Sequence, residues 1–352
     1  MGGCQSVIKS LSEGLVANYG YECLVRSVSY KDTEKTINGV NYGSVNFNPN
    51  VFIKDLKDNK IDLLVVYEDV FVHFPTILRF GDELPFRIVL VSGGGRFLKE
   101  NNRYLTKLKD SRIKIITHLD GHFDSLLFNK YGIKHTTIPA FINDFEFENF
   151  SPIWIRDKYN IKTDKIILCV SNIFPGKGHL ESLAILEKLK DLKDKFTVIF
   201  AYNSFNQLKV LEDEFIRNLK KLPINSLVLE GLKREEILNL FCHADIFLFP
   251  SQKESFGLVI LEAVYSGSKV VCMPVGISES IPNCEIIKNS TKDFKDNYLF
   301  TKDVVNSFEN SLRNMINDDN LKKSFDGKCR ILIKEKYSLS SVLEKYNSIF
   351  KG

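Results

Sequence analysis

Short runs of apolar and β-branched residues alternate with longer segments of helical period along most of the chain. The segments between the short runs have the apolar spacing of amphipathic helices. Such alternation is typical of a parallel sheet with crossover helices. In the first half, the runs that predict strands lie at 22–28, 62–67, 87–91, 114–117 and 135–138. We therefore predict a doubly wound α/β domain there.

The second half of the chain repeats the same rhythm. Its predicted strands lie at 165–170, 196–201, 226–229, 246–249 and 269–272. Its predicted helices lie at 178–192, 205–221, 234–243, 257–266, 302–317, 321–336 and 340–350. Two Rossmann-like α/β units in tandem, facing a cleft, are the predicted architecture.

The boundary between the units is predicted after the strand that ends at Ile138. This strand runs into Pro139 and then into a segment rich in Phe, Asn and Glu at 141–151. The chain of 352 residues is long enough for two domains with separate cores. We predict an N-terminal domain at 1–150, a C-terminal domain at 151–336 and a terminal helix within 337–352.

The start of the chain has an unusual pattern. Gly2 and Gly3 open an amphipathic helix, as a glycine turn after a first strand would, yet no strand precedes them. The first strand of a doubly wound sheet is central, and here it is missing. Two alternatives follow: the natural chain starts upstream of Met1, or the N-terminal sheet is built without that strand.

Composition excludes several function classes. The net charge is only +4, and no basic stripe is interleaved with aromatic residues, so we expect no nucleic-acid partner. Seven scattered cysteines, never spaced as CxxC, support neither a disulfide framework nor a zinc site. We therefore expect reduced cysteines and no metal.

No apolar run approaches the ~18 residues of a membrane span, and the N-terminus lacks the pattern of a signal peptide. We expect a cytoplasmic protein. The basic stretch 99–114 has two interpretations, a solvated helix face or a peripheral contact with an anionic membrane.

Two glutamates lie in the most informative segment, 244–282. A buried strand ends at Pro250, a polar loop brings Glu254 to the start of a helix at Gly257, and Glu262 follows eight residues after Glu254. Unpaired backbone N–H groups at the helix start can bind sugar hydroxyls or phosphate oxygens. Glu262 can accept the hydroxyls of a ribose. The simpler interpretation is a capping carboxylate and a solvated helix residue.

A second candidate element, 170–179, contains Lys177 and Gly178 between a strand and a helix. A lysine beside a helix N-terminus can stabilise the charge that grows on a leaving diphosphate. A surface turn explains this pattern equally well.

The segment PSxxExFGLxxLEAxxxG resembles the Glu-x7-Glu signature of the large family of retaining, nucleotide-sugar-dependent glycosyltransferases, the family 4-like glycosyl transferases group 1. The matching residues are Pro250, Ser251, Glu254, Phe256, Gly257, Leu258, Glu262, Ala263 and Gly267. Ile138-Pro139 followed by Asn143-Asp144 resembles the end of that family's first domain. Tyr337-Ser338-Leu339 and the following helix resemble its terminal helix, which crosses back to the N-terminal domain.

The resemblance implies a GT-B fold and the transfer of a hexose from a nucleotide-diphosphate sugar to a glycan or lipid-linked acceptor. It implies retention at the anomeric carbon by front-face attack, with no metal and no cofactor, which agrees with the absence of an Asp-x-Asp motif. Glu254 and Lys177 become the catalytic candidates. The donor-binding candidates are Glu262, Ser255, Phe256, Gly257, Leu258, Gly178, Asn172, Lys233 and Arg234.

The sequence departs from the family pattern GRLxxxKG at two positions. Ser171 stands at the glycine, and Asn172 stands at the arginine that joins the lysine on the diphosphate. Lys233 and Arg234 are therefore candidates for the second cation.

The acceptor side departs further. Family members often have a histidine where this chain has Ser92, followed by Gly93-Gly94-Gly95. These glycines indicate either a tight turn at a ligand or a plain surface loop. The acceptor-side candidates are Gly3, Ser92, Gly93 and His118, and His73 and His122 are further histidines near strand ends.

Two other functions fit the same scaffold. One is a non-catalytic nucleotide-sugar-binding protein, favoured by Asn172, Ser92 and the missing strand. The other is a sugar-nucleotide epimerase or a phosphorylase, which the Glu-x7-Glu context disfavours.

Overall fold

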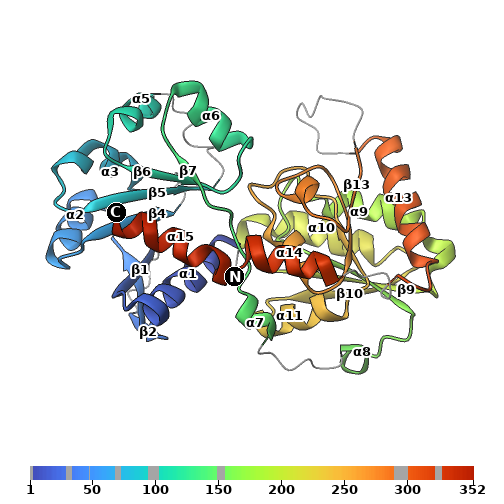
Figure 1. Cartoon of the computed structure of the whole chain (residues 1–352). Helices are drawn as coiled ribbons and strands as arrows, with labels where there is room; N and C mark the ends of the chain where they lie inside the picture. Colours follow the sequence, from blue (N-terminus) through green and yellow to red (C-terminus); the bar gives the residue numbers. More distant parts are fainter. Residues whose placement is uncertain are drawn as a thin grey trace. The chain divides into compact units, whose positions relative to one another are not determined.

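The computed structural model forms two compact units, one of Asp144–Glu335 and one of Gly2–Asn143 together with Lys336–Gly352 (Figure 1). Each unit has its own β-strands and its own buried core. The structure describes residues 3–28, 34–46, 48–67, 73–93, 103–148, 155–288, 300–321 and 327–352.

The unit of Asp144–Glu335 contains a six-stranded parallel sheet with the order β10-β9-β8-β11-β12-β13. Chain order runs outward from β8 on one side and outward from β11 on the other. All residues of β9 and β11 are buried, as expected for a parallel sheet covered on both faces. The strands are β8 (Lys165–Val170), β9 (Phe196–Tyr202), β10 (Asn225–Glu230), β11 (Ile246–Phe249), β12 (Lys269–Cys272) and β13 (Cys284–Ile286).

Two groups of helices accompany this sheet: α9 packs with α10 and α13, and α11 packs with α12 and α8. The helices from the start of this unit onward are α7 (Asp144–Glu148), α8 (Ile155–Lys158), α9 (His179–Glu187), α10 (Lys209–Leu219), α11 (Arg234–His243), α12 (Leu258–Tyr265), α13 (Lys302–Ile316) and α14 (Gly327–Tyr337), with 3-10 turns at Lys190–Leu192, Asn206–Leu208 and Ser278–Ser280.

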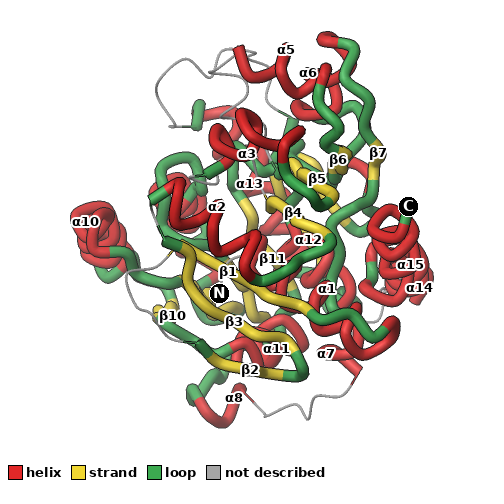
Figure 2. The backbone as a smooth tube through the Cα atoms, turned by 90° about the vertical axis from the view of Figure 1, so that its left-hand side faces the viewer, coloured by secondary structure: helices red, strands yellow, loops and turns green. Residues whose placement is uncertain are grey.

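The N-terminal unit has two sheets, with the orders β1-β3-β2 and β4-β5-β6-β7. Figure 2 shows β1, β3 and β2 side by side. Phe74, Leu90 and Phe128 belong to the core of this unit. The strands are β1 (Cys23–Val28), β2 (Lys35–Ile37), β3 (Val40–Val45), β4 (Leu63–Tyr67), β5 (Arg87–Ser92), β6 (Lys114–Thr117) and β7 (Thr136–Thr137). The helices are α1 (Gly3–Tyr19), α2 (Pro49–Asp58), α3 (Phe74–Phe80), α5 (Arg103–Asp110), α6 (Phe123–Tyr131) and α15 (Leu339–Lys351), with a 3-10 turn at Gly81–Glu83.

All the strands predicted from the sequence are present, but the prediction missed β2, β3 and β13. Strands β2 and β3 are antiparallel and are joined by Asn38-Gly39, both with positive φ, which is the turn that favours a two-residue hairpin. The predicted strand β1 therefore pairs in a three-stranded sheet with β3 and β2, separate from the sheet of β4 to β7. The first element that the structure describes is α1, which begins at Gly3.

The terminal helix α15 packs against α1. A Cβ atom at Gly14 of α1 would lie 3.3 Å from Cδ1 of Leu343, so a glycine permits this close approach. The backbone N–H of Leu339 donates to the carbonyl of Ile142 at 2.8 Å, which holds the start of α15 beside the last segment of Gly2–Asn143.

We predict that Leu343→Ala destabilises the N-terminal unit by about 2–5 kcal/mol, because it removes a buried side chain from the contact between α1 and α15. Hydrogen exchange of the α1 amides should accelerate. The exposed neighbour gives the control, since Lys345→Ala should leave that exchange unchanged. Equal exchange in the two variants would contradict this packing.

Candidate functional site

The loops that follow β8 and β11 meet at the carboxyl end of the C-terminal sheet, where the strand order reverses. Ligands of open α/β sheets bind at such switch points. The backbone N–H of Gln252 donates to the carbonyl of Gly176 at 2.8 Å, so the two loops are joined directly. Gly178 has a φ of +80°, and a Cβ atom there would lie only 2.4 Å from the carbonyl oxygen of Pro250. The contact therefore requires glycine at this position.

The two residues predicted to be catalytic lie together at this switch point. Nζ of Lys177 is 2.6 Å from Oε1 of Glu254. The same carboxylate oxygen accepts a hydrogen bond from Oγ of Ser251 at 2.8 Å. The side chains of Lys177 and Glu254 are 28% and 13% exposed, so both remain accessible to a ligand.

The helix α12 begins beside this ion pair. Gly257 is its N-cap, with a left-handed φ of +87° and no side-chain cap. The loop after β12 contacts Phe256, the residue before this N-cap: the backbone N–H of Ile277 donates to the carbonyl of Phe256 at 2.8 Å. Of the other donor-binding candidates here, Ser255 is exposed and Leu258 is half-buried. The helix start thus presents backbone amides next to Glu254.

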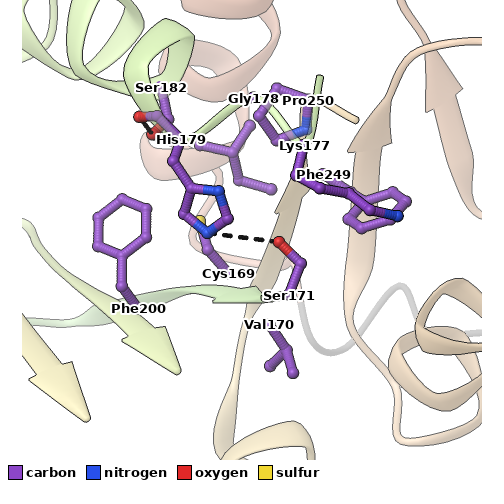
Figure 3. A pocket seen from close by; sticks show the side chains of 11 residues that line it. Cys169, Val170, Ser171, Lys177, Gly178, His179, Ser182, Phe200, Phe249 and Pro250 are labelled. Atoms are coloured by element: carbon purple, nitrogen blue, oxygen red, sulfur yellow. Dashed lines mark hydrogen bonds between the residues drawn. The ribbon is translucent and has the colours of Figure 1, made fainter. Parts of the chain in front are cut away.

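A small pocket lies between the ends of β8 and β11, lined by Ser171, Lys177, His179 and Pro250 among others (Figure 3). Nε2 of His179 is 3.4 Å from Oγ of Ser171. The pKa of His179 is lowered to about 4, mainly by burial; a hydrogen bond with the Ser171 backbone opposes this shift, and the charge of Lys177 contributes to it. The imidazole is therefore neutral at pH 7. The sequence analysis missed His179, although it directly follows the Lys177-Gly178 pair.

Asn172 stands at the position where the family pattern has an arginine. Oδ1 of Asn172 lies 3.4 Å from both the backbone nitrogen and Nδ2 of Asn203. Asn172 therefore links the ends of β8 and β9 and brings no charge to the site.

The two candidates for a second cation differ in their surroundings. Nη2 of Arg234 is 2.6 Å from Oε1 of Glu262, and its Nε is 2.8 Å from Oε2 of Glu146. Lys233 is the exposed N-cap of α11. The structure thus brings Arg234 to Glu262, and Lys177 to Glu254.

In the N-terminal unit, a separate polar cluster lies at the carboxyl ends of β4, β5 and β6. It consists of Tyr67, Ser92, His118 and Asp124. Oγ of Ser92 donates to Oδ2 of Asp124 at 2.9 Å, and Nε2 of His118 is 3.4 Å from the Tyr67 hydroxyl. Burial lowers the pKa of His118 to about 4, so this histidine is neutral at pH 7.

Sequence analysis found Ser92 and His118 but missed Tyr67 and Asp124. Tyr67 is the last residue of a predicted strand, a position that could have indicated it. Gly93 is half-buried in the bend after β5, while Gly94 and Gly95 fall outside the described residues. Gly3 is the exposed first residue of α1, and no contact within the described chain joins it to the cluster.

Two further findings concern the described residues only. No group of three or more His, Cys, Asp or Glu side chains within them is arranged to hold a metal ion. None of the described helices has both the length and the apolar character needed to cross a membrane.

A family model described as glycosyl transferases group 1 matches residues 153–330, more than half of the chain. The chain belongs to this family. The match contains Lys177, Glu254 and Glu262, so the candidate site lies within the matched region. The family predicted from the Glu-x7-Glu segment is confirmed.

Among curated relatives, this glycosyl transferase is 28% identical to a poly(ribitol-phosphate) alpha-N-acetylglucosaminyltransferase from Staphylococcus aureus (strain COL), over 60% of this chain and 40% of that protein. It is 24% identical to an N-acetyl-alpha-D-glucosaminyl L-malate synthase from Bacillus anthracis, over 61% of this chain and 52% of that protein. The chain thus spans about half the length of these two relatives, or less.

Solved structures of the same fold cover nearly the whole chain. A sucrose-phosphate synthase from Thermosynechococcus elongatus superimposes with a TM-score of 0.77 at 14% identity, covering 99% of this chain and 93% of that one. WaaG, a glycosyltransferase involved in lipopolysaccharide biosynthesis, gives 0.72 at 16% identity, covering 100% and 97%. At such identities the likeness shows the fold alone, and it confirms the predicted GT-B fold.

We predict that Gly178→Ala destabilises the C-terminal unit more than Gly231→Ala does. Both glycines have a positive φ, which costs an alanine about 1–2 kcal/mol. Only at Gly178 does the added Cβ also meet backbone, which should add about 1–3 kcal/mol of overpacking. Urea denaturation measures both effects. Equal losses would show that the two loops are not locked by this contact.

Proposed function

We propose that this chain is a retaining glycosyltransferase that moves a hexose from a nucleotide-diphosphate sugar to a glycan or lipid-linked acceptor, without a metal ion. The observation that carries the proposal is the Lys177–Glu254 ion pair at the switch point of the C-terminal sheet. A lysine and a carboxylate beside two glycine-capped helix starts support a site for a diphosphate and its sugar.

The donor roles follow from charge and position. The diphosphate is assigned to Lys177 and to the start of α9 at Gly178, because a cation and unpaired amides both favour an anion. The sugar is assigned to Glu254 and to the amides of Phe256, Gly257 and Leu258. Glu262 accepts hydrogen bonds from the hydroxyls of the ribose. Ser255, which is exposed in the same loop, completes the donor side.

In the proposed reaction, the bond between the anomeric carbon and the phosphate oxygen breaks and its electron pair goes to the leaving diphosphate. The positive charge of Lys177 and the helix N-termini stabilise this developing anion. The acceptor hydroxyl attacks from the same face, and its proton goes to a diphosphate oxygen. Retention results without a covalent enzyme intermediate. The family resemblance supports this course.

The acceptor is assigned to the N-terminal unit, where Tyr67, Ser92, His118 and Asp124 lie at the carboxyl ends of adjacent strands. The relatives include the poly(ribitol-phosphate) alpha-N-acetylglucosaminyltransferase and an N-acetylgalactosamine-N,N'-diacetylbacillosaminyl-diphospho-undecaprenol 4-alpha-N-acetylgalactosaminyltransferase from Campylobacter jejuni. We propose a carbohydrate or glycolipid acceptor and a cytoplasmic protein, in which 99–114 is either a solvated helix face or a peripheral contact with an anionic membrane. Of that stretch, 99–102 lie outside the described residues.

One alternative has a specific observation in its favour. Asn172 is uncharged and bonded to Asn203, so the usual second cation on the diphosphate is lacking at this position. A nucleotide-sugar-binding protein without turnover would tolerate that loss.

A thermal-shift screen of the purified chain with UDP, GDP, ADP and their sugar conjugates tests the proposal, because a ligand of the native state raises its melting temperature. At least one nucleotide sugar should raise the melting temperature of the chain. Turnover of that donor should persist in EDTA. Loss of turnover in EDTA with recovery in manganese or magnesium would refute the metal-independent mechanism. Binding with no turnover on any acceptor would favour the binding protein, and no binding at all would refute both.

We further predict that Lys177→Ala lowers turnover about 100-fold or more, since a preorganised charge on a developing anion is typically worth about 3–4 kcal/mol. Asn172→Arg should leave turnover equal or higher by restoring a second cation. The exposed Lys253, in the loop after β11, provides the control, and Lys253→Ala should be nearly neutral. Steady-state rates with one accepted donor decide. Near-normal turnover in Lys177→Ala would remove this residue from the phosphate site.

A further inference from the structure

Arg234, the first residue of α11, bridges carboxylates from two other helices. Its Nη2 lies 2.6 Å from Oε1 of Glu262 on α12, and its Nε lies 2.8 Å from Oε2 of Glu146 on α7. Figure 1 shows α7 next to α11. The guanidinium therefore pairs with one carboxylate from each of these two helices.

The bridge is mostly enclosed. The side chains of Arg234, Glu146 and Glu262 are 26%, 24% and 9% exposed. Burial opposes the charge on Arg234, but the attraction of Glu262 and Glu146 outweighs it and raises the pKa of the guanidinium. Arg234 also lies over the ring of Phe147 at 5.9 Å. These contacts fix the side chain in one place.

The local charge argues against a role for Arg234 on the diphosphate. One guanidinium and two carboxylates carry a net charge of −1, which repels an anion rather than attracts it. Lys177, in contrast, shares its charge with one carboxylate only among the described contacts. This local charge disfavours Arg234 as the second cation on the diphosphate.

The geometry leaves one carboxylate oxygen of Glu262 for another partner. Arg234 engages Oε1, and among the described ion pairs none involves Oε2. A carboxylate whose position is fixed by an arginine is a good acceptor for a pair of neighbouring hydroxyl groups, because its orientation is settled before the ligand arrives.

We infer that Arg234 is a positioning residue for Glu262, holding this carboxylate to receive hydrogen bonds from the ribose hydroxyls of the donor, and that Glu146 anchors Arg234 through its Nε. The inference rests on the proposed function. Removal of the Arg234 guanidinium should therefore weaken the preference for a nucleotide with ribose hydroxyls over one without them. The preference for a diphosphate over a monophosphate should not change.

Calorimetric binding of three probes separates these effects: the nucleoside diphosphate that binds best in the thermal-shift screen, its 2′,3′-dideoxy analogue, and the corresponding monophosphate. The wild type should prefer the ribose form over the dideoxy form by roughly 10-fold or more, the worth of hydrogen bonds to a charged group. In Arg234→Ala, as in Glu262→Ala, this preference should fall to within about 3-fold. The preference for diphosphate over monophosphate should stay as in the wild type.

Further variants make the test specific. Arg234→Lys should recover part of the ribose preference, because a lysine can still pair with Glu262. The double variant of Arg234→Ala with Glu262→Ala should lose no more than Glu262→Ala alone. The exposed neighbour supplies the control, and Glu235→Ala should bind all three probes like the wild type. If Arg234→Ala does not fold, Arg234→Lys and Glu146→Gln carry the test, each with an intermediate loss of ribose preference.

Two results would overturn the inference while leaving the proposed function in place. One is a loss of diphosphate preference in Arg234→Ala with the ribose preference retained, which would put the guanidinium on the phosphates. The other is retention of both preferences, which would make the bridge purely structural. A wild-type chain that binds no nucleoside diphosphate would instead remove the proposed function and this inference with it.

Discussion

The close backbone approach of Gly178 to Pro250 is the constraint on which the candidate site depends. It joins the loop after β8 to the loop after β11, and only a residue without a Cβ fits there. These loops follow β8 and β11, the two central strands at which the strand order reverses. The contact therefore brings Nζ of Lys177 to 2.6 Å from Oε1 of Glu254. It also sets the starts of α9 and α12 beside them. A cation, a carboxylate and two glycine-capped helix ends thus share one small region.

Each of the two glutamates in this region is paired with a cation. A site for an anionic ligand that contains two carboxylates repels its ligand unless cations offset them. Here Lys177 offsets Glu254, and Arg234 offsets Glu262. The two pairs are not equivalent: Lys177 has one carboxylate partner among the described contacts and can attract phosphate, whereas Arg234 is already shared between two. We therefore propose that the glutamates accept hydrogen bonds from hydroxyl groups, while Lys177 binds the diphosphate.

Much of this was predictable from the sequence, because the strands that build the C-terminal sheet are continuous apolar runs and the Glu-x7-Glu segment has a fixed spacing. The hairpin β2–β3 was missed although Asn38-Gly39 is a strong turn signal, and β13 was missed because three residues, Cys284–Ile286, give no periodicity. The bridge from Glu146 to Arg234 was beyond prediction, since 88 residues separate the partners in the chain. Asp124 was missed because its partner Ser92 is 32 residues away in the chain, whereas the position of Tyr67 at the end of a predicted strand could have indicated it.

The central claim is that the diphosphate of a nucleotide sugar binds at the carboxyl ends of β8 and β11. Hydrogen exchange of the full chain, with and without a saturating nucleoside diphosphate, tests it most directly. The account predicts slower exchange in 171–180 and 254–262, which include the starts of α9 and α12. Unchanged exchange in both segments, with slowing confined to the opposite end of the sheet or to the N-terminal unit, would contradict it.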